Sequence, residues 1–211
     1  MSAMPEEAKR PAESEAAILA ATREILAESG VRGLTMEGVA ARAGVAKTTV
    51  YRRWGSKEDL ALEVLLDMAS QVVVAVPDLE STREELVAFV DGSVNVLRTT
   101  LMGRVIQGLV PELAADPELA GPFREQVVAM RVAEARRLVE RGIARGDLRP
   151  DVDITLANEL LFGPVYYRLL LSGAPLEPGL AERIVDAVLS AFAAGGPDAA
   201  GSRAHVDTVP G

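Results

Sequence analysis

The feature of the sequence that most limits its fold is a series of short helical segments, separated by glycine, within the first 60 residues. Apolar residues recur at helical spacing over residues 13–29, and Gly30 follows as a C-cap. Thr35 is a suitable N-cap for a second helix, which ends at Gly44. The pattern therefore predicts two short helices, the second of which ends in a tight glycine turn.

A third short helix is predicted directly after this turn, over residues 48–54. It places Val50 and Trp54 four residues apart on one face, where we expect both in the core. Two helices, a short glycine turn and a third helix within about 40 residues form a helix-turn-helix. The sequence thus predicts a small three-helix domain at the N-terminal end.

The turn before the third helix also invites comparison with a phosphate-binding loop, since it reads Gly-Val-Ala-Lys-Thr-Thr. A P-loop requires glycine immediately before the lysine and again five positions earlier, because only glycine lets the backbone amides close around a phosphate. Those two positions are Ala46 and Ala41 here. We therefore set aside a nucleotide-binding loop at Lys47.

Charge is distributed unevenly along the chain. The whole sequence has a net charge of −9, which by itself argues against a polyanionic partner. Residues 31–57, however, contain six basic side chains and a single acidic one, Glu37. A basic segment attached to an acidic body is typical of a small electrostatic binding module joined to a domain with another task.

Several functional classes are disfavoured by composition. Cysteine is absent, and His205 is the only histidine, so neither a thiolate metal site nor a His-dependent catalytic triad can be formed. No segment has the apolar length of a signal peptide or a membrane span. We expect a cytoplasmic protein without a membrane segment, metal or cofactor, and a non-enzymatic function.

The stretch ILAATREILAESGVRGLTMEGVAARAGVAKTTVYRRWGSKEDLALEVL resembles the N-terminal DNA-binding domain of the tetracycline-repressor (TetR) family of bacterial transcriptional regulators, over roughly residues 14–66. The resemblance implies an all-α fold, in which an N-terminal three-helix helix-turn-helix domain is followed by a larger helical ligand-binding and dimerisation domain. Two departures are visible. Ala46 stands where the family has a Ser or Thr cap, and Arg53-Trp54 replaces the commoner aromatic or His followed by Phe.

In the family, the third helix enters the major groove of an operator. By position, Lys47 and Thr48 open this recognition helix, and Lys57 would bind a phosphate from the start of the fourth helix. Lys, Arg, Thr and Tyr side chains suit these roles, because they neutralise phosphates, donate to phosphate oxygens or read base edges. The expected DNA-binding residues are Thr35, Lys47, Thr48, Thr49, Tyr51, Arg52, Arg53 and Lys57.

Helix signals and breakers give four expected segments. Residues 1–12 are expected to be a disordered arm, 13–57 the DNA-binding domain, 58–194 the ligand-binding and dimerisation domain, and 195–211 a disordered tail. Within the third segment, long helices are predicted over 123–145, 152–171 and 178–194, and Gly163-Pro164 is expected to kink the second of these.

The last two predicted helices suggest a homodimer. The helix over 152–171 is apolar on two sides, and an apolar helix must be covered on each such side. In the family these helices form a four-helix bundle with their copies. The expected interface residues are Leu156, Leu160, Tyr167, Leu180, Ile184, Val188 and Ala191.

A small-molecule effector is expected to bind among the middle helices. Large or adaptable side chains there suit an apolar pocket with few polar contacts, and few charges must point inward, which favours a lipophilic or weakly polar effector over a phosphate-rich one. The candidate residues are Phe89, Met102, Ile106, Gln107, Met130, Asn158, Phe162 and Tyr166.

The main prediction is therefore a ligand-responsive DNA-binding repressor that leaves an inverted-repeat operator when its effector binds. Two alternatives keep the same fold: a DNA-binding protein without an effector, and a regulator that responds to a protein partner. A helical enzyme that uses only carboxylates is the remote third, because the pair Glu84-Glu85 suits a solvated helix face.

Overall fold

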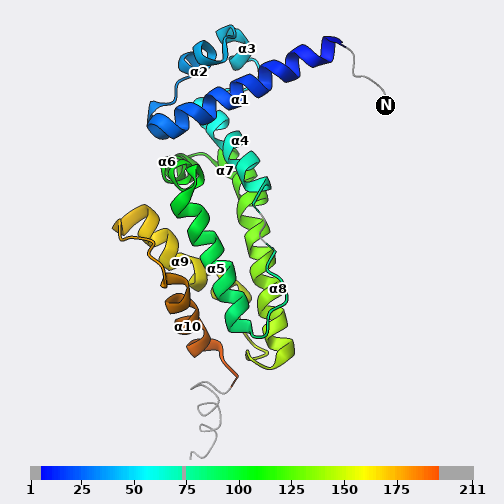
Figure 1. Cartoon of the computed structure of the whole chain (residues 1–211), viewed down its shortest axis with the longest axis vertical. Helices are drawn as coiled ribbons and strands as arrows, with labels where there is room; N and C mark the ends of the chain where they lie inside the picture. Colours follow the sequence, from blue (N-terminus) through cyan, green and yellow to red (C-terminus); the bar gives the residue numbers. More distant parts are fainter. Residues whose placement is uncertain (1–5, 73–74, 195–211) are drawn as a thin grey trace, which may run out of the picture. The chain divides into compact units, whose positions relative to one another are not determined.

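The computed structural model describes residues 6–72 and 75–194, and within them the regular elements are helices (Figure 1). The chain divides into two compact units. The first combines residues up to Val73 with Asn95–Met130, and the second combines Val74–Val94 with the residues from Arg131 onward. The predicted all-α fold is confirmed.

The helices of the first unit include the predicted three short ones. The predicted helices are α1 (Glu6–Gly33), α2 (Met36–Ala43) and α3 (Lys47–Tyr51). The other elements of this unit are α4 (Lys57–Ser70), α6 (Leu101–Ala115), α7 (Pro117–Phe123) and the π-helical turn η1 (Arg124–Val128). The second unit contains α9 (Ile154–Tyr167), the π-helical turn η2 (Arg168–Ser172) and α10 (Leu180–Phe192). Both units include part of α5 (Thr82–Thr99) and α8 (Ala129–Arg145).

The N-terminal helix begins earlier than the sequence suggests. It starts at Glu6, so the expected disordered arm over residues 1–12 is contradicted for residues 6–12. The assignment continues to Gly33 across a local kink at Gly30, whose φ of 65° lies in the left-handed region that favours glycine. Residues 1–5 and the predicted tail 195–211 lie outside the described residues.

Local capping explains where the next three helices begin and end. Thr35 caps α2 by accepting from the backbone N–H of Gly38, and Gly44 ends that helix with a φ of 68°, both as predicted. Ala46 gives α3 no side-chain cap. In α4, Ser56 and Asp59 form a reciprocal capping box, in which each side chain accepts from the other residue's backbone N–H.

The core of the first unit extends beyond the helix-turn-helix. Val50 and Trp54 are buried as predicted, and α6 packs against α1 and α4. The contact with α1 is close at Gly108, because a Cβ placed there would lie 2.7 Å from the Cβ of Val31. Packing therefore groups α4 and α6 with the helix-turn-helix, which differs from the predicted boundary between residues 57 and 58.

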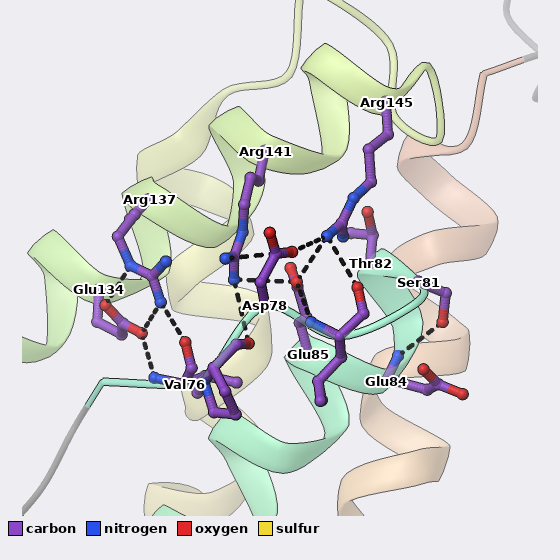
Figure 2. A network of polar contacts seen from close by, with 12 residues as sticks. Val76, Asp78, Ser81, Thr82, Glu84, Glu85, Glu134, Arg137, Arg141 and Arg145 are labelled. Carbon is purple, nitrogen blue, oxygen red and sulfur yellow. Dashed lines mark hydrogen bonds and ion pairs between the residues drawn. The ribbon is translucent and has the colours of Figure 1, made fainter.

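In the second unit, a charged network ties the extended segment before α5 to α8 (Figure 2). Glu85 is completely buried, and its Oε1 accepts from the backbone N–H of Leu79 at 3.0 Å and from Arg145 at 2.9 Å. Arg141 lies 3.0 Å from the same oxygen. Glu85 is therefore a core residue, whereas the sequence suggested a solvated helix face for the pair Glu84-Glu85.

A second part of the network holds the start of the same segment. Glu134 accepts from the backbone N–H of Val76 at 2.7 Å, and Arg137 donates to the carbonyl of Val76 at 2.6 Å while also binding Glu134 (Figure 2). The hydrogen bonds from Arg137 and Val76 lower the pKa of the Glu134 carboxyl, against the effect of burial. Side chains of α8 thus replace the regular hydrogen bonds that this connection lacks.

Candidate nucleic-acid interface

The side of α3 that faces solvent is polar. Its exposed residues, counting Arg52 directly after the helix, are Lys47, Thr48, Tyr51 and Arg52. These positions are spaced so that they share one side of a helix. Val50, on the opposite side, is fully buried, and Thr49 is half-buried between the two. Four of the predicted DNA-binding residues are therefore together on one accessible face.

Glu37 in α2 lies against this face. Lys47 Nζ is 3.3 Å from Glu37 Oε1, and the Tyr51 hydroxyl is 3.5 Å from the same oxygen. A hydrogen bond within Glu37, from its own backbone N–H, and the contact with Lys47 lower the pKa of its carboxyl. The carboxylate therefore stays charged at neutral pH and occupies two side chains that are expected to contact phosphates.

Other basic residues of the segment are paired with carboxylates from α1 and α4. Arg53 lies 2.7 Å from Glu15 in α1 and 3.7 Å from Glu63 in α4, and its guanidinium is 5.4 Å from the Trp54 ring centroid. Arg53, in the turn after α3, thus contacts two other helices, α1 and α4. In the free chain its guanidinium is thus paired with carboxylates, and its predicted contact with a phosphate or a base stays a prediction.

Thr35, Lys57 and Arg52 differ in what holds them. Thr35 caps α2, and Lys57 Nζ donates to the carbonyl of Val31 at 3.4 Å. Arg52, in contrast, makes no side-chain hydrogen bond or ion pair with the described residues. A guanidinium without an internal partner, next to an accessible polar helix face, is well suited to bind a phosphate or the edge of a guanine.

We expect that Glu37→Gln strengthens binding to DNA of any sequence. A single charge near a phosphate at the surface is worth about 1 kcal/mol, and its removal corresponds to about five-fold in affinity. Fluorescence anisotropy with a labelled random duplex at fixed salt measures this change. Glu118→Gln, on α7, removes the same charge from another exposed position and is the control. Weaker or unchanged binding by Glu37→Gln would contradict a DNA contact beside Glu37.

The predicted effector residues divide between the two units. Met102 and Ile106 are buried in the first unit, to which the exposed Gln107 and Met130 also belong. Phe89, Asn158, Phe162 and Tyr166 belong to the second unit. There the rings of Phe89 and Phe162 pack edge to face, with centroids 5.2 Å apart.

Sequence reasoning missed Arg131, which joins this aromatic group. Its guanidinium lies 4.7 Å from the ring centroid of Phe162 and 5.1 Å from that of Tyr166, and it donates to the Tyr166 hydroxyl at 2.5 Å. One signal for it was present in the sequence, because Arg131 is a single charge within the otherwise apolar run 127–133.

The predicted dimer residues also separate. Leu156, Leu160 and Tyr167 are exposed along one side of α9, and Leu171 in η2 continues this stripe. Of the other predicted stripe of the helix, at Leu161, Val165 and Leu169, the first two residues are buried and Leu169 is half-buried. In α10, Ala191 is exposed, but Leu180, Ile184 and Val188 are buried in the core of a single chain. That apolar side of α10 therefore packs against other parts of the same chain.

The part of the chain that the structure describes contains neither a metal-binding cluster nor a membrane-spanning helix. No group of three or more His, Cys, Asp or Glu side chains among them is arranged to hold a metal ion. None of the described helices combines the length and apolar character needed to cross a membrane.

Comparison with known families gives matches at both ends of the chain. Residues 18–64 match the family described as bacterial regulatory proteins of the tetR family. Residues 76–188 match the tetracyclin repressor-like C-terminal domain. The two matches include α2, α3, α9 and most of α10.

Individual relatives cover most of the chain. The HTH-type transcriptional regulator YdeS of Bacillus subtilis is 32% identical over 83% of this chain and 86% of its own length. The DNA-binding transcriptional repressor TetR of Mycobacteroides abscessus is 29% identical over 82% of this chain and 90% of its own length. Both are transcriptional regulators, in agreement with the prediction of a non-enzymatic function.

A solved structure supports the same comparison. The crystal structure of the TetR family transcription regulator SCO0332 is 33% identical, with a TM-score of 0.65, and it covers 84% of this chain and 97% of that one. The similarity therefore extends over both sequence and fold.

Proposed function

The chain belongs to the TetR family of bacterial regulatory proteins and is a DNA-binding transcriptional regulator, and from this premise we propose that it is a ligand-responsive repressor. It binds an inverted-repeat operator as a homodimer in the cytoplasm and releases the operator when a small, mostly apolar effector binds. The observation that carries the DNA contact is the exposed polar face of α3.

The proposed contact with DNA uses the four exposed residues of that face together with residues at the N-terminal ends of α2 and α4. Arg52 supplies a guanidinium that has no partner among the described residues, and Lys47 and Tyr51 exchange Glu37 for phosphate oxygens. Thr48 and Thr49 add hydroxyl donors near the start of the helix. Thr35 and Lys57, at the starts of α2 and α4, complete the set, and Arg53 is omitted because of its pairing with Glu15.

The proposed dimer is supported by the exposed apolar stripe on α9 and η2. Leu156, Leu160, Tyr167 and Leu171 present a contiguous series of large apolar side chains at helical spacing. In a two-fold dimer the same patch serves both subunits, and two recognition helices related by that axis read two half-sites of an inverted repeat.

The proposed effector response rests on a shift between two conformations, one of which binds DNA better. The second unit offers aromatic rings at Phe89, Phe162 and Tyr166 to an apolar ligand. A coupling of about 1–3 kcal/mol, or about 5- to 150-fold in DNA affinity, is typical of such a linkage.

The test of DNA binding compares two variants of the full chain on duplexes from the region around its own gene. We expect that Arg52→Ala lowers operator affinity by about ten-fold and reduces the preference over random DNA, since a good base contact contributes about 1–3 kcal/mol of discrimination. Lys57→Ala should weaken binding to all duplexes alike and flatten the salt dependence by about one unit, because it removes a phosphate contact.

The control for both variants is Arg104→Ala, which removes an exposed arginine from α6. Its affinity and salt dependence should equal those of the unaltered protein. DNA binding that is independent of salt, or that stays unchanged in both Arg52→Ala and Lys57→Ala, would contradict the proposed interface.

A further inference from the structure

Arg131 differs from the other arginines of α8. Arg136, Arg137, Arg141 and Arg145 each lie within 4 Å of a carboxylate oxygen. Arg131 forms no ion pair with any described residue, although it is half-buried. Its contacts are instead the faces of Phe162 and Tyr166 and the Tyr166 hydroxyl. The second unit thus contains a cation that is held by aromatic rings and has no anionic partner among the residues that the structure describes.

Two polar atoms near these rings are buried without a hydrogen bond. They are Arg131 Nε, a donor, and Asn158 Oδ1, an acceptor. Asn158, Phe162 and Tyr166 are spaced four residues apart and therefore lie along one side of α9. A buried donor or acceptor without a partner costs about 1–3 kcal/mol, so both atoms favour a ligand that satisfies them.

A guanidinium presents five N–H donors in a planar fork that matches the two oxygens of a carboxylate. In the free chain, the hydroxyl of Tyr166 accepts one of these hydrogen bonds at 2.5 Å. A neutral hydroxyl oxygen is a weaker acceptor for a guanidinium than a carboxylate, because the carboxylate carries a full negative charge and can accept two parallel hydrogen bonds. A ligand carboxylate can therefore compete for the guanidinium.

We propose that Arg131 is the receptor for a carboxylate on the effector, whose class is an otherwise apolar monocarboxylic acid. The apolar part of the acid packs on Phe89, Phe162 and Tyr166, and Asn158 accepts a hydrogen bond from a donor on the ligand. A single cation in the group matches a single negative charge. The inference rests on the proposed effector response and adds the chemical class that produces it.

The test uses the full-length protein and two pairs of probes that differ only in the charged group: decanoate with 1-decanol, and 4-phenylbutyrate with 4-phenyl-1-butanol. Calorimetry measures binding, and anisotropy of a labelled operator measures DNA release. We expect at least one acid to bind ten-fold or more tightly than its alcohol. Arg131→Gln should reduce the ratio of acid to alcohol affinity to about one.

The control Arg136→Gln removes an exposed arginine from the same helix and should keep the full preference for the acid. Arg131→Lys keeps the positive charge and should therefore retain part of the preference for the acid. Such a result would show that the loss in Arg131→Gln is due to the missing charge. Thermal unfolding of each variant separates a binding defect from a folding defect.

The outcomes separate this inference from the proposed function. Equal binding of acids and alcohols, with release of DNA by both, would overturn the role of Arg131 and leave the effector response standing. Failure of all four probes to bind would also overturn the carboxylate assignment. It would leave the proposed DNA contact untouched, because that contact is tested separately by Arg52→Ala and Lys57→Ala. A preference for the acid that survives in Arg131→Gln would assign the carboxylate to another residue.

Discussion

Leu160→Glu should convert the protein to a monomer and reduce its operator affinity by about 10²- to 10⁴-fold, the range by which linking two binding modules raises affinity. Leu160 is 41% exposed in the middle of the apolar stripe of α9. In a two-fold dimer, a glutamate there introduces two like charges into an apolar contact, where a charge without a partner is costly.

Light scattering at micromolar concentration should give about the 22.3 kDa mass of one chain for Leu160→Glu and twice that mass for the unaltered protein. Ala133→Glu, which adds the same charge at an exposed position of α8, should remain dimeric. A dimeric Leu160→Glu protein with full operator affinity would show that the stripe is not the dimer contact.

Glu85→Ala should lower the free energy of unfolding by about 3 kcal/mol, because breaking a buried ion pair from one side costs about 3–5 kcal/mol. The lower end of this range applies because Arg141 and Arg145 are partly exposed and also contact Asp78, so they retain a partner. The backbone N–H of Leu79 loses its acceptor as well. The connection between α4 and α5 would then lose part of its contacts with α8, while Glu134 and Arg137 would still bind Val76.

Urea unfolding at one protein concentration measures this change, since guanidinium would itself screen the ion pairs. Glu84→Ala removes the neighbouring glutamate, which is exposed in the same helical turn, and should change the free energy of unfolding by at most about 0.5 kcal/mol. Glu85→Gln keeps an oxygen for Leu79 and should have an intermediate effect. Equal stability of Glu84→Ala and Glu85→Ala would contradict the importance of the buried contacts.

The helix-turn-helix could be predicted because its signals are local. The hydroxyl of Thr35, the left-handed glycine at 44 and the apolar pair Val50 and Trp54 each act over three or four residues, which a single sequence displays directly. The order of these signals along the chain was sufficient to predict the class of the domain and the polar face of its third helix.

The partners of the charged residues could not be predicted in the same way. The basic segment was counted within residues 31–57, whereas Arg53 is paired with Glu15 and Glu63, which lie outside that window. Arg131 and Tyr166 are likewise 35 residues apart. Such contacts depend on tertiary packing, which the spacing of charges along a chain does not reveal.

The dimer residues show a related limit. Periodicity identified the apolar sides of α9 and α10, but an apolar side packs equally well on its own chain or on a partner. The structure separates the two cases, since Leu156 and Leu160 remain exposed while Ile184 and Val188 are buried. The exposed fraction of each side chain, rather than its hydrophobicity, distinguishes the candidate interface from the core.

Glu37 also affects the motion of the side chains that it contacts. A lysine side chain carries about 2 kcal/mol of rotamer entropy, part of which is lost on binding. Because Glu37 already holds Lys47 and Tyr51 through one carboxylate oxygen, some of this ordering precedes the encounter with DNA. Glutamine at position 37 keeps an oxygen for both donors, whereas alanine would release them. The residue that repels the phosphates thus also orders two side chains of the recognition helix before DNA arrives.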